Sequence, residues 1–513
     1  MKRISLLNHV LGPVMRGPSS SHTAGSYHIG RMLRDLFGEI PREARFSFDV
    51  KGSYGVCYHH QASDRAFLAG LLGWDLLDRR FAEALDRAPG EGLDASFEVV
   101  PLPGEDLHPN EVAFRLRGPE GELSGRARSV GGGMVRVTEL QGYPADLNGE
   151  DHVLLAAGPE GAVRAALEGV APRLRVVPGE RGVLGIAEAP EPWPQAVLAD
   201  LAGRAARGEL AWVRTCRPLQ FPLKGAPLAE SAEDLLRLAK ERDGRLASAA
   251  LAHEASLLGL SEEALLKEMT RRLGIFREAV RRGLEGDLSG KLQLLPPYAG
   301  TLEAARREGR APTGGIGLSA AIRAMAAMHA CGALEVVCAA PTGGAAGALP
   351  GVFIALEEER GLSEEVLARG LFAAAAVGLV LAARGTFAAE EAGCQVEIGA
   401  AGAMAAAGVV EVFGGTALQA LDAGAIGFQN TMGSVCDPVG GMVEIPCHTR
   451  NAALAASAFV LADLVLAGCP NPIPLDETVD AVMDVGRRLP PELRCTALGG
   501  LALCPSAVRL AGR

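Results

Sequence analysis

Residues 370–383 read Gly-Leu-Phe-Ala-Ala-Ala-Ala-Val-Gly-Leu-Val-Leu-Ala-Ala and form the longest apolar run in the chain, between Arg369 and Arg384. The run is shorter than the roughly 20 residues that a helix needs to span a bilayer. Its length, and the charged residues at both ends, favour a helix that is buried in a protein core. We therefore expect a soluble core helix here and no membrane anchor.

The sequence around this run has the same helical character. From Ala229 onward, stretches rich in Ala, Leu and Val are separated by Gly and Pro, and no strand pattern is visible. Ser231, Ser261 and Ser363 are each followed by two acidic residues within three positions. An apolar-periodic run comes next, and this pattern is typical of helix N-termini. Residues 221–513 are therefore predicted to form an all-helical domain.

Residues 1–150 have a different pattern, in which strand-like and helix-like segments alternate. Residues 44–50 alternate as a strand does, and residues 66–74 are predicted to be helical. A strand at 111–116 leads into a Gly-rich turn at 118–125, and the strand pattern continues through 129–137. These residues are predicted to form an α/β or α+β domain.

Residues 151–220 are predicted to form a third, smaller module. Strands are expected at 152–157, 174–178, 182–188 and 211–217, and helices at 160–170 and 194–206. The resulting order, βαββαβ, is typical of the ferredoxin-like split βαβ arrangement. The module is similar to ACT-type regulatory modules, which implies an amino-acid effector; a plain structural spacer is the alternative.

Composition excludes several classes of function. The chain has 513 residues, a net charge of -11 and a pI of about 5.5. No basic run is present, so we expect no nucleic-acid partner. The N-terminus lacks an export signal, and the ten cysteines show no disulfide pattern, so a cytoplasmic location with metal-binding or catalytic cysteines is expected.

Three cysteines, Cys394, Cys436 and Cys447, stand in Gly- or Pro-rich surroundings. Three thiolates can hold an iron–sulfur cluster and leave one iron open, whereas four suit electron transfer. An open iron can bind a substrate oxygen as a Lewis acid. The alternative is that these are inert, buried cysteines, which are common in helical cores.

Polar residues in turns supply further candidates. Ser19, Ser20, Ser21, His22 and Thr23 could bind a carboxylate or carry a proton, although a helix N-cap would look the same. The motif Ala-Pro-Thr-Gly-Gly occurs twice, and its turns could offer backbone N–H groups to an anion or be simple helix breaks. Lys291 could neutralise a carboxylate or be solvated. The residues of the repeated turns are Thr313, Gly314, Gly315, Thr342, Gly343 and Gly344.

Several of these motifs resemble a known family. Residues 393–399, 429–441 and 443–447 are similar to the α region of iron–sulfur-dependent L-serine dehydratases. Residues 12–25, which contain the Ser-Ser-Ser-His-Thr segment, resemble the β region of the same enzymes, as do 108–110 and 129–133. The resemblance covers nearly the whole chain and is least clear over residues 151–220.

The resemblance implies a lyase with fused β and α regions that converts L-serine to pyruvate and ammonia, in amino-acid catabolism and gluconeogenesis. It implies a [4Fe–4S] cluster on Cys394, Cys436 and Cys447, no pyridoxal phosphate, and a catalytic role for Ser19–Thr23. Both Thr-Gly-Gly turns, Lys291 and Asn110 would then bind substrate. Cys504 is a candidate fourth ligand, since some family members place a terminal cysteine on the open iron.

One segment departs from the family pattern. The family usually has Gly-His-Gly-Thr-Asp in the β region, and here residues 60–64 read His-Gln-Ala-Ser-Asp. Gln61 then stands in the place of the histidine, and glutamine cannot act as a base. Either this position is not essential here, or a neighbouring histidine, His59 or His60, has taken its role, or the substrate differs. Our hypothesis is that His60 replaces the missing imidazole as a catalytic residue.

Other readings of the sequence stay open at this stage. L-Threonine or L-cysteine could be the substrate, because a methyl group gives only about 1–3 kcal/mol of discrimination. A non-catalytic amino-acid or redox sensor is a candidate from another class, and an electron-transfer protein fits less well. Because ACT-like modules often pair, a homo-oligomer, either a dimer or a tetramer, is expected.

Overall fold

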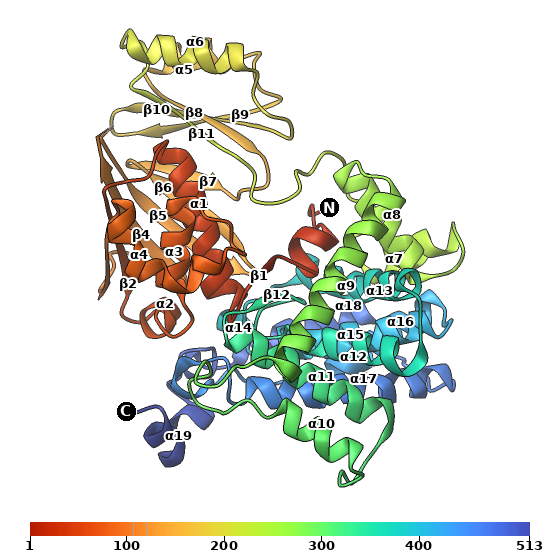
Figure 1. Ribbon diagram of the computed structural model, residues 1–513. Helices are drawn as coiled ribbons and strands as arrows, with labels where there is room; N and C mark the ends of the chain where they lie inside the picture. Colours follow the sequence, from red (N-terminus) through yellow and green to blue (C-terminus); the bar gives the residue numbers. More distant parts are fainter. Residues whose placement is uncertain (106, 120, 513) are drawn as a thin grey trace. The chain divides into compact units, whose positions relative to one another are not determined.

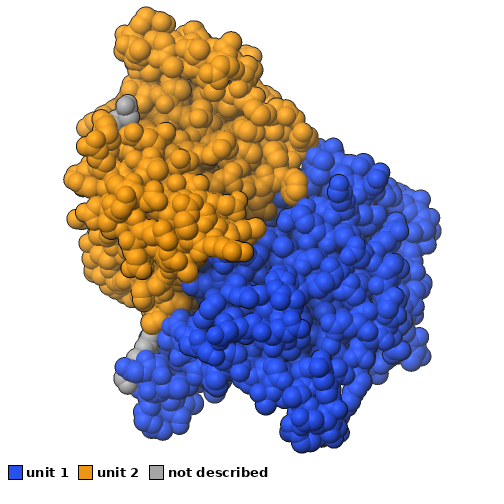
Figure 2. All heavy atoms as spheres, in the orientation of Figure 1, with its two compact units in different colours: residues 1–24, 131–133, 225–513 blue, residues 25–130, 134–224 orange. Residues whose placement is uncertain are grey.

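The computed structural model describes residues 1–105, 107–119 and 121–512, and Figure 1 shows their helices and strands. The chain divides into two compact units, which are coloured separately in Figure 2. The helical unit contains residues 1–24, 131–133 and 225–513, and the sheet unit contains residues 25–130 and 134–224. The division into domains 1–150, 151–220 and 221–513 stays a prediction, and the first 24 residues lie in the helical unit.

The helical unit is built around α15 (Ile398–Val412), which packs against α12, α13, α16 and α17. Nearly every side chain of α15 is buried, because Ala and Gly let neighbouring helices approach closely. The other helices of the unit are α7 (Ala232–Lys240), α8 (Leu246–Leu258), α9 (Glu262–Glu285), α10 (Ala299–Arg307), α11 (Gly315–Gly332), α12 (Ala348–Arg360), α13 (Glu364–Arg384), α14 (Ala389–Ala392), α16 (Ala417–Thr431), α17 (Cys447–Leu466), α18 (Leu475–Arg488) and α19 (Pro505–Leu510), with the short turns η5 (Cys394–Val396), η6 (Val439–Gly441), η7 (Pro491–Leu493) and η8 (Gly500–Leu503).

Helix α13 confirms the buried helix predicted for residues 370–383. The helix is longer than the apolar run, because Ser363 caps its N-terminus by accepting a hydrogen bond from the Val366 N–H, at 3.4 Å. Three helices, α13, Cys394–Val412 and α17, are long and apolar enough to cross a membrane by length and composition. The apolar windows of the first two are 78% and 89% buried within the protein, and that of α17 is 39% buried.

The N-terminal segment contradicts the all-helical prediction for residues 221–513. Strand β1 (Val14–Arg16) pairs antiparallel with β12 (Val336–Cys338), so the helical unit contains a short two-stranded sheet. The partner of β12 lies more than 300 residues earlier in the chain, so no local pattern could reveal it. Two single-turn helices flank β1, namely η1 (Leu6–Val10) and η2 (Ser20–Ala24).

The sheet unit carries a six-stranded sheet in the order β3-β2-β4-β5-β6-β7. Side chains alternate along β2, so that Ala44, Phe46 and Phe48 are buried while their neighbours are not. Helices α1 and α3 pack against each other, and the ring of Phe67 stacks on that of Phe46 with centroids 4.3 Å apart. The elements are α1 (Gly25–Phe37), β2 (Glu43–Asp49), α2 (Ser53–Cys57), α3 (Ser63–Leu72), η3 (Arg79–Glu83), α4 (Ala84–Arg87), η4 (Ala88–Glu91), β3 (Asp94–Val100), β4 (Glu111–Gly118), β5 (Gly121–Gly131), β6 (Met134–Leu140) and β7 (Tyr143–Leu147).

These elements confirm the mixed helix and strand pattern that we predicted for residues 1–150, with one correction. Much of the Gly-rich stretch 118–125 is not a turn, because β5 already begins at Gly121 and pairs with β4. The glycine content of this stretch led to the wrong prediction, because glycines also occur within β5.

The remaining strands of the sheet unit form the module that the sequence predicted. The order along the chain is βαββαβ, the sheet order is β11-β8-β10-β9, and all three pairs of neighbours are antiparallel. This is the split βαβ arrangement; an effector function of the ACT type stays a prediction. The elements are β8 (His152–Gly158), α5 (Glu160–Leu167), β9 (Arg173–Gly179), β10 (Gly182–Ala189), α6 (Gln195–Ala206) and β11 (Trp212–Cys216).

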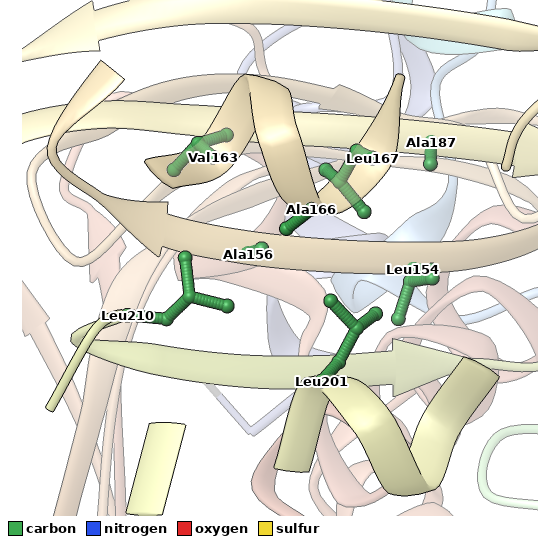
Figure 3. Packing of buried hydrophobic residues seen from close by; sticks show 8 residues of the cluster. All are labelled: Leu154, Ala156, Val163, Ala166, Leu167, Ala187, Leu201 and Leu210. Atoms are coloured by element: carbon green, nitrogen blue, oxygen red, sulfur yellow. The ribbon is translucent and has the colours of Figure 1, made fainter. Parts of the chain in front are cut away.

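The core of the module lies between its sheet and its two helices (Figure 3). Alternate residues of β8, Leu154 and Ala156, share one face of the sheet. Val163, Ala166 and Leu167 follow the spacing of one helix face in α5 and meet that sheet face. The buried cluster consists of Leu154, Ala156, Val163, Ala166, Leu167, Ala187, Leu201 and Leu210.

Candidate active site

The three predicted cluster cysteines are all buried and all lie in the helical unit. Cys394 begins η5 directly after Gly393, whose positive φ of 76° turns the chain there. Cys447 is the first residue of α17, where Pro446 precedes the helix. Cys436 lies in an extended segment that bridges to Arg494.

Gln395 forms hydrogen bonds that connect the segment of Cys394 to the segment of Cys436. Its side chain is fully buried, accepts a hydrogen bond from the Gly433 N–H at 2.8 Å and donates one to the Ala392 carbonyl at 2.8 Å. The backbone N–H of Gln395 donates to the Ser434 carbonyl at 3.2 Å. The residues beside Cys394 and Cys436 are thus held side by side, although 42 positions separate the two cysteines in the sequence.

The thiols of these segments gather at one place. Hydrogen bonds with the Cys394 and Cys495 thiols, together with burial, raise the pKa of Cys436 well above its ordinary value. Burial, followed by the charges of Cys394 and Glu397, raises the pKa of Cys447 in the same way. Crowded, buried thiols that resist ionisation when no metal is bound are typical of a metal site, because a metal stabilises the thiolate form.

Cys495, rather than Cys504, is the additional cysteine at this place. The Cys495 N–H donates to the Cys436 carbonyl at 2.9 Å, and Cys495 has a positive φ of 62°, which is uncommon for a residue other than glycine. Cys504 is exposed at the start of α19.

Glu397 is a site residue that the sequence analysis did not select. Its carboxyl accepts a hydrogen bond from Thr342 Oγ1 at 2.6 Å, and its Oε2 lies 3.9 Å from Cys394 Sγ. Burial raises the pKa of Glu397 to about 8, although the Thr342 bond opposes that shift. The raised pKa favours the protonated form of this carboxyl, which lies beside Cys394.

The Ser19–Thr23 segment forms a second polar group, mostly within the turn η2. Ser21 Oγ donates to Glu390 Oε1 at 2.6 Å and lies 3.0 Å from His22 Nδ1. The same carboxylate oxygen is 3.4 Å from His22 Nδ1. All these side chains are buried, so Glu390 orients both the hydroxyl and the imidazole.

The turn Thr342–Gly344 joins the two groups. A Cβ atom at Gly343 would lie 2.7 Å from the Ser20 backbone nitrogen, and one at Gly344 would lie 2.7 Å from Glu397 Oε1. The Cys331 thiol donates to the carbonyl oxygens of Pro18 and Gly343, at 3.4 and 3.2 Å. The turn therefore touches the Ser19–Thr23 segment on one side and Glu397 on the other.

Some other predicted site residues of the helical unit are exposed. Thr313, Gly314 and Gly315 are exposed at the start of α11, and Lys291 is exposed with its Nζ 3.0 Å from Glu335 Oε1. Asn110 and His60 belong to the sheet unit. There the imidazole that meets the buried Asp64 is that of His59, at 2.7 Å.

The residues present are compatible with a metal or an iron–sulfur centre. Among the described residues, one group of three or more metal-binding side chains was found, with ligand atoms of Cys394, Glu397 and Cys436 within 4.8 Å of one another. Cys447 begins α17, and the partial positive charge of a helix N-terminus favours a thiolate. Glu390 and Glu397 could have been found from the sequence, since they flank Cys394 in an otherwise apolar, Ala- and Gly-rich region.

The chain is similar to proteins of one family. Residues 229–502 match the family model described as serine dehydratase alpha chain. The probable L-serine dehydratase, alpha chain, of Bacillus subtilis is 37% identical over 280 residues, which are 55% of this chain and 93% of that protein. The L-serine dehydratase, alpha chain, of Peptoniphilus asaccharolyticus is 32% identical over 275 residues, 54% of this chain and 94% of that protein.

A third relative is a beta chain and covers a smaller share of this chain. The probable L-serine dehydratase, beta chain, of Bacillus subtilis is 40% identical over 149 residues, which are 28% of this chain and 64% of that protein. Relatives of both the alpha and the beta kind are thus found for this one chain.

Proposed function

This chain belongs to the serine dehydratase alpha chain family and is an L-serine ammonia-lyase, and we propose that it works with a [4Fe–4S] cluster held by Cys394, Cys436 and Cys447. The products are pyruvate and ammonia. The convergence of three buried cysteines from separate segments carries the cluster proposal. The alternative substrates and the sensor reading are not favoured, since the relatives are named L-serine dehydratases.

When bound, such a cluster supplies a Lewis-acidic iron that makes the serine hydroxyl a better leaving group. The buried carboxyl of Glu397 lies beside Cys394, and its raised pKa favours the protonated form, so it is placed to donate a proton to the departing hydroxyl oxygen. Thr342 Oγ1 keeps the Glu397 carboxyl in this position.

The Ser19–Thr23 segment and the Thr342–Gly344 turn are proposed to bind the substrate carboxylate. Their hydroxyl and backbone N–H groups are suited to an anion, and the two segments are in contact. His22 is proposed to handle the substrate α-proton, with Glu390 orienting its ring through Nδ1. No pyridoxal phosphate is required in this scheme.

Cys495 is proposed as a fourth thiol ligand that holds the cluster in the resting protein. Its contact with the Cys436 thiol supports this role, and the exposure of Cys504 favours Cys495 over it. Cys495 would then add a fourth thiol to the three that would hold the cluster.

Three further properties are proposed. The βαββαβ order supports an amino-acid effector site in residues 151–217. All ten cysteines are free thiols, which supports a cytoplasmic location. A homo-oligomer, either a dimer or a tetramer, follows from the pairing that is common among ACT-like modules.

The experiment is to purify the protein without oxygen, record its absorbance at about 400 nm, where iron–sulfur clusters absorb, and assay pyruvate formation from L-serine. Single Ser variants of Cys394, Cys436 and Cys447 are each expected to lose iron and activity. The matched control is Cys469→Ser, which changes an exposed thiol and is expected to alter neither. Full iron content in the Cys436→Ser protein would contradict the ligand assignment.

A further inference from the structure

Asn451 connects the proposed substrate turn to the helix of a cluster cysteine. Its side chain is fully buried on α17, one turn after Cys447. Nδ2 donates to the carbonyl oxygens of Cys447 and Gly344, both at 2.9 Å. Oδ1 accepts from the N–H groups of Gly347 and Ala348, at 3.1 and 3.0 Å.

These contacts use the whole hydrogen-bonding capacity of the amide, which has two donors and two acceptor sites. The two acceptor bonds also serve α12, whose N-cap residue, Gly347, has no side chain with which to cap the helix. One side chain therefore caps α12, holds the end of the Thr342–Gly344 turn and binds the first turn of α17.

Close packing around Asn451 prevents the turn from shifting freely. A Cβ atom at Gly347 would lie 3.0 Å from Asn451 Cβ and 2.7 Å from Met328 Cγ, so the backbone meets α17 and α11 directly. The carbonyl that Asn451 binds belongs to Gly344, which lies against Glu397. A displacement of the turn by even a fraction of an ångström would alter the Thr342–Glu397 bond of 2.6 Å.

We propose that Asn451 is a positioning residue that holds the carboxylate-binding turn Thr342–Gly344 in register with Cys447. This inference rests on the proposed function, because it takes that turn to bind the carboxylate of L-serine. Asn451 does not touch the substrate in this scheme, and it acts through the backbone of Gly344.

Asn451→Asp separates the two roles of the side chain. Aspartate can still accept hydrogen bonds from Gly347 and Ala348, so the cap of α12 is kept. An ionised aspartate cannot donate to the carbonyl oxygens of Gly344 and Cys447, and a protonated one has a single O–H and can serve only one of them. The turn is therefore expected to lose its connection to α17 while the cysteines remain in place.

The test measures iron and sulfide per chain, together with kcat and KM for L-serine, in oxygen-free protein. Asn451→Asp is expected to keep its iron and to raise KM about tenfold or more, with a smaller change in kcat, since one hydrogen bond of about 1.4 kcal/mol corresponds to tenfold. A purely structural role would instead lower iron content and kcat together and leave KM unchanged, and that result would overturn the proposal.

Two more proteins complete the design. Asn471→Asp is the matched control, because Asn471 Nδ2 also makes two donor contacts, with Asp422 Oδ1 and the Ile473 carbonyl, in the same unit. Its KM is expected to equal that of the wild type. If Asn451→Asp does not fold, Asn451→Ser replaces it, since serine can cap α12 but is too short to reach both carbonyl oxygens. An inactive wild type with no iron would refute the proposed function itself.

Discussion

Replacing Glu254 with alanine is expected to loosen the N-terminal segment that carries Ser19–Thr23. Glu254 is fully buried on α8, and it accepts hydrogen bonds from Ser5 Oγ at 2.5 Å, the Leu6 N–H at 2.7 Å and the Leu7 N–H at 3.0 Å. Arg272 on α9 binds the carbonyl oxygens of Leu7 and Leu11 at the other end of η1. A carboxylate at the start and a guanidinium at the end of this turn complement its dipole.

The magnitude follows from the number of hydrogen bonds that are lost. Glu254→Ala leaves three buried donors without an acceptor, at about 1 kcal/mol or more each, or about 3 kcal/mol in total. That free energy corresponds to about a hundredfold increase in local opening. Glu254→Gln keeps the two bonds to Oε1 and loses only the bond from Leu6, so about tenfold is expected.

Amide hydrogen exchange followed by mass spectrometry, on peptides that cover residues 5–24, measures this opening directly. The exchange rate is expected to be lowest in the wild type, higher in Glu254→Gln and highest in Glu254→Ala. KM for L-serine should increase in the same order. The control is Glu263→Ala, which removes an exposed carboxylate from the first turn of α9. Equal exchange in the Gln and Ala variants, or none above the wild type, would show that Glu254 does not anchor the segment.

Three other perturbations have defined outcomes. Gly344→Ala would place a Cβ atom 2.7 Å from Glu397 Oε1, so we expect at least about a tenfold loss of kcat/KM with iron retained. At Gly274, in contrast, a Cβ atom meets nothing within 4 Å. Gly274→Ala should therefore stabilise α9 by about 0.5–1 kcal/mol. Burial lowers the pKa of His9 from 6.5 to about 4. As the pH falls below 6.5, the unfolded chain therefore protonates His9 before the folded protein does. The free energy of unfolding should decrease by up to about 3 kcal/mol between pH 6.5 and pH 4. Urea unfolding at a series of pH values checks this, and a slope unchanged in His9→Gln would contradict it. Thr416→Ala removes the capping box of α16 and should cost about 1 kcal/mol without changing KM.

The βαββαβ module shows how much of the fold local pattern can predict. Each of its strands and helices lies within a few residues of its predicted position, because alternation and helical spacing are local properties of a chain that folds on its own neighbours. The helix over residues 370–383 was predictable for the same reason. Strand β12 was not, because its only partner in the described sheets, β1, comes from the opposite end of the sequence.

The candidate site divides in the same way. The residue types and their local contexts made Cys394, Cys436, Cys447 and the Ser19–Thr23 segment candidates for metal binding or anion binding. The sequence by itself also determined the helix caps and the order of the module.

Which of those residues come into contact depends on long-range packing. Glu397 reaches Thr342 across 55 positions, and Ser21 reaches Glu390 across 369. Cys495 contacts the Cys436 thiol, whereas Cys504 is exposed. Likewise, the turn at Thr342 contacts other site residues, whereas, among the described residues, the identical motif at Thr313 does not. Two equal motifs cannot be told apart by their own residues, because what separates them is the packing of distant helices around only one of them.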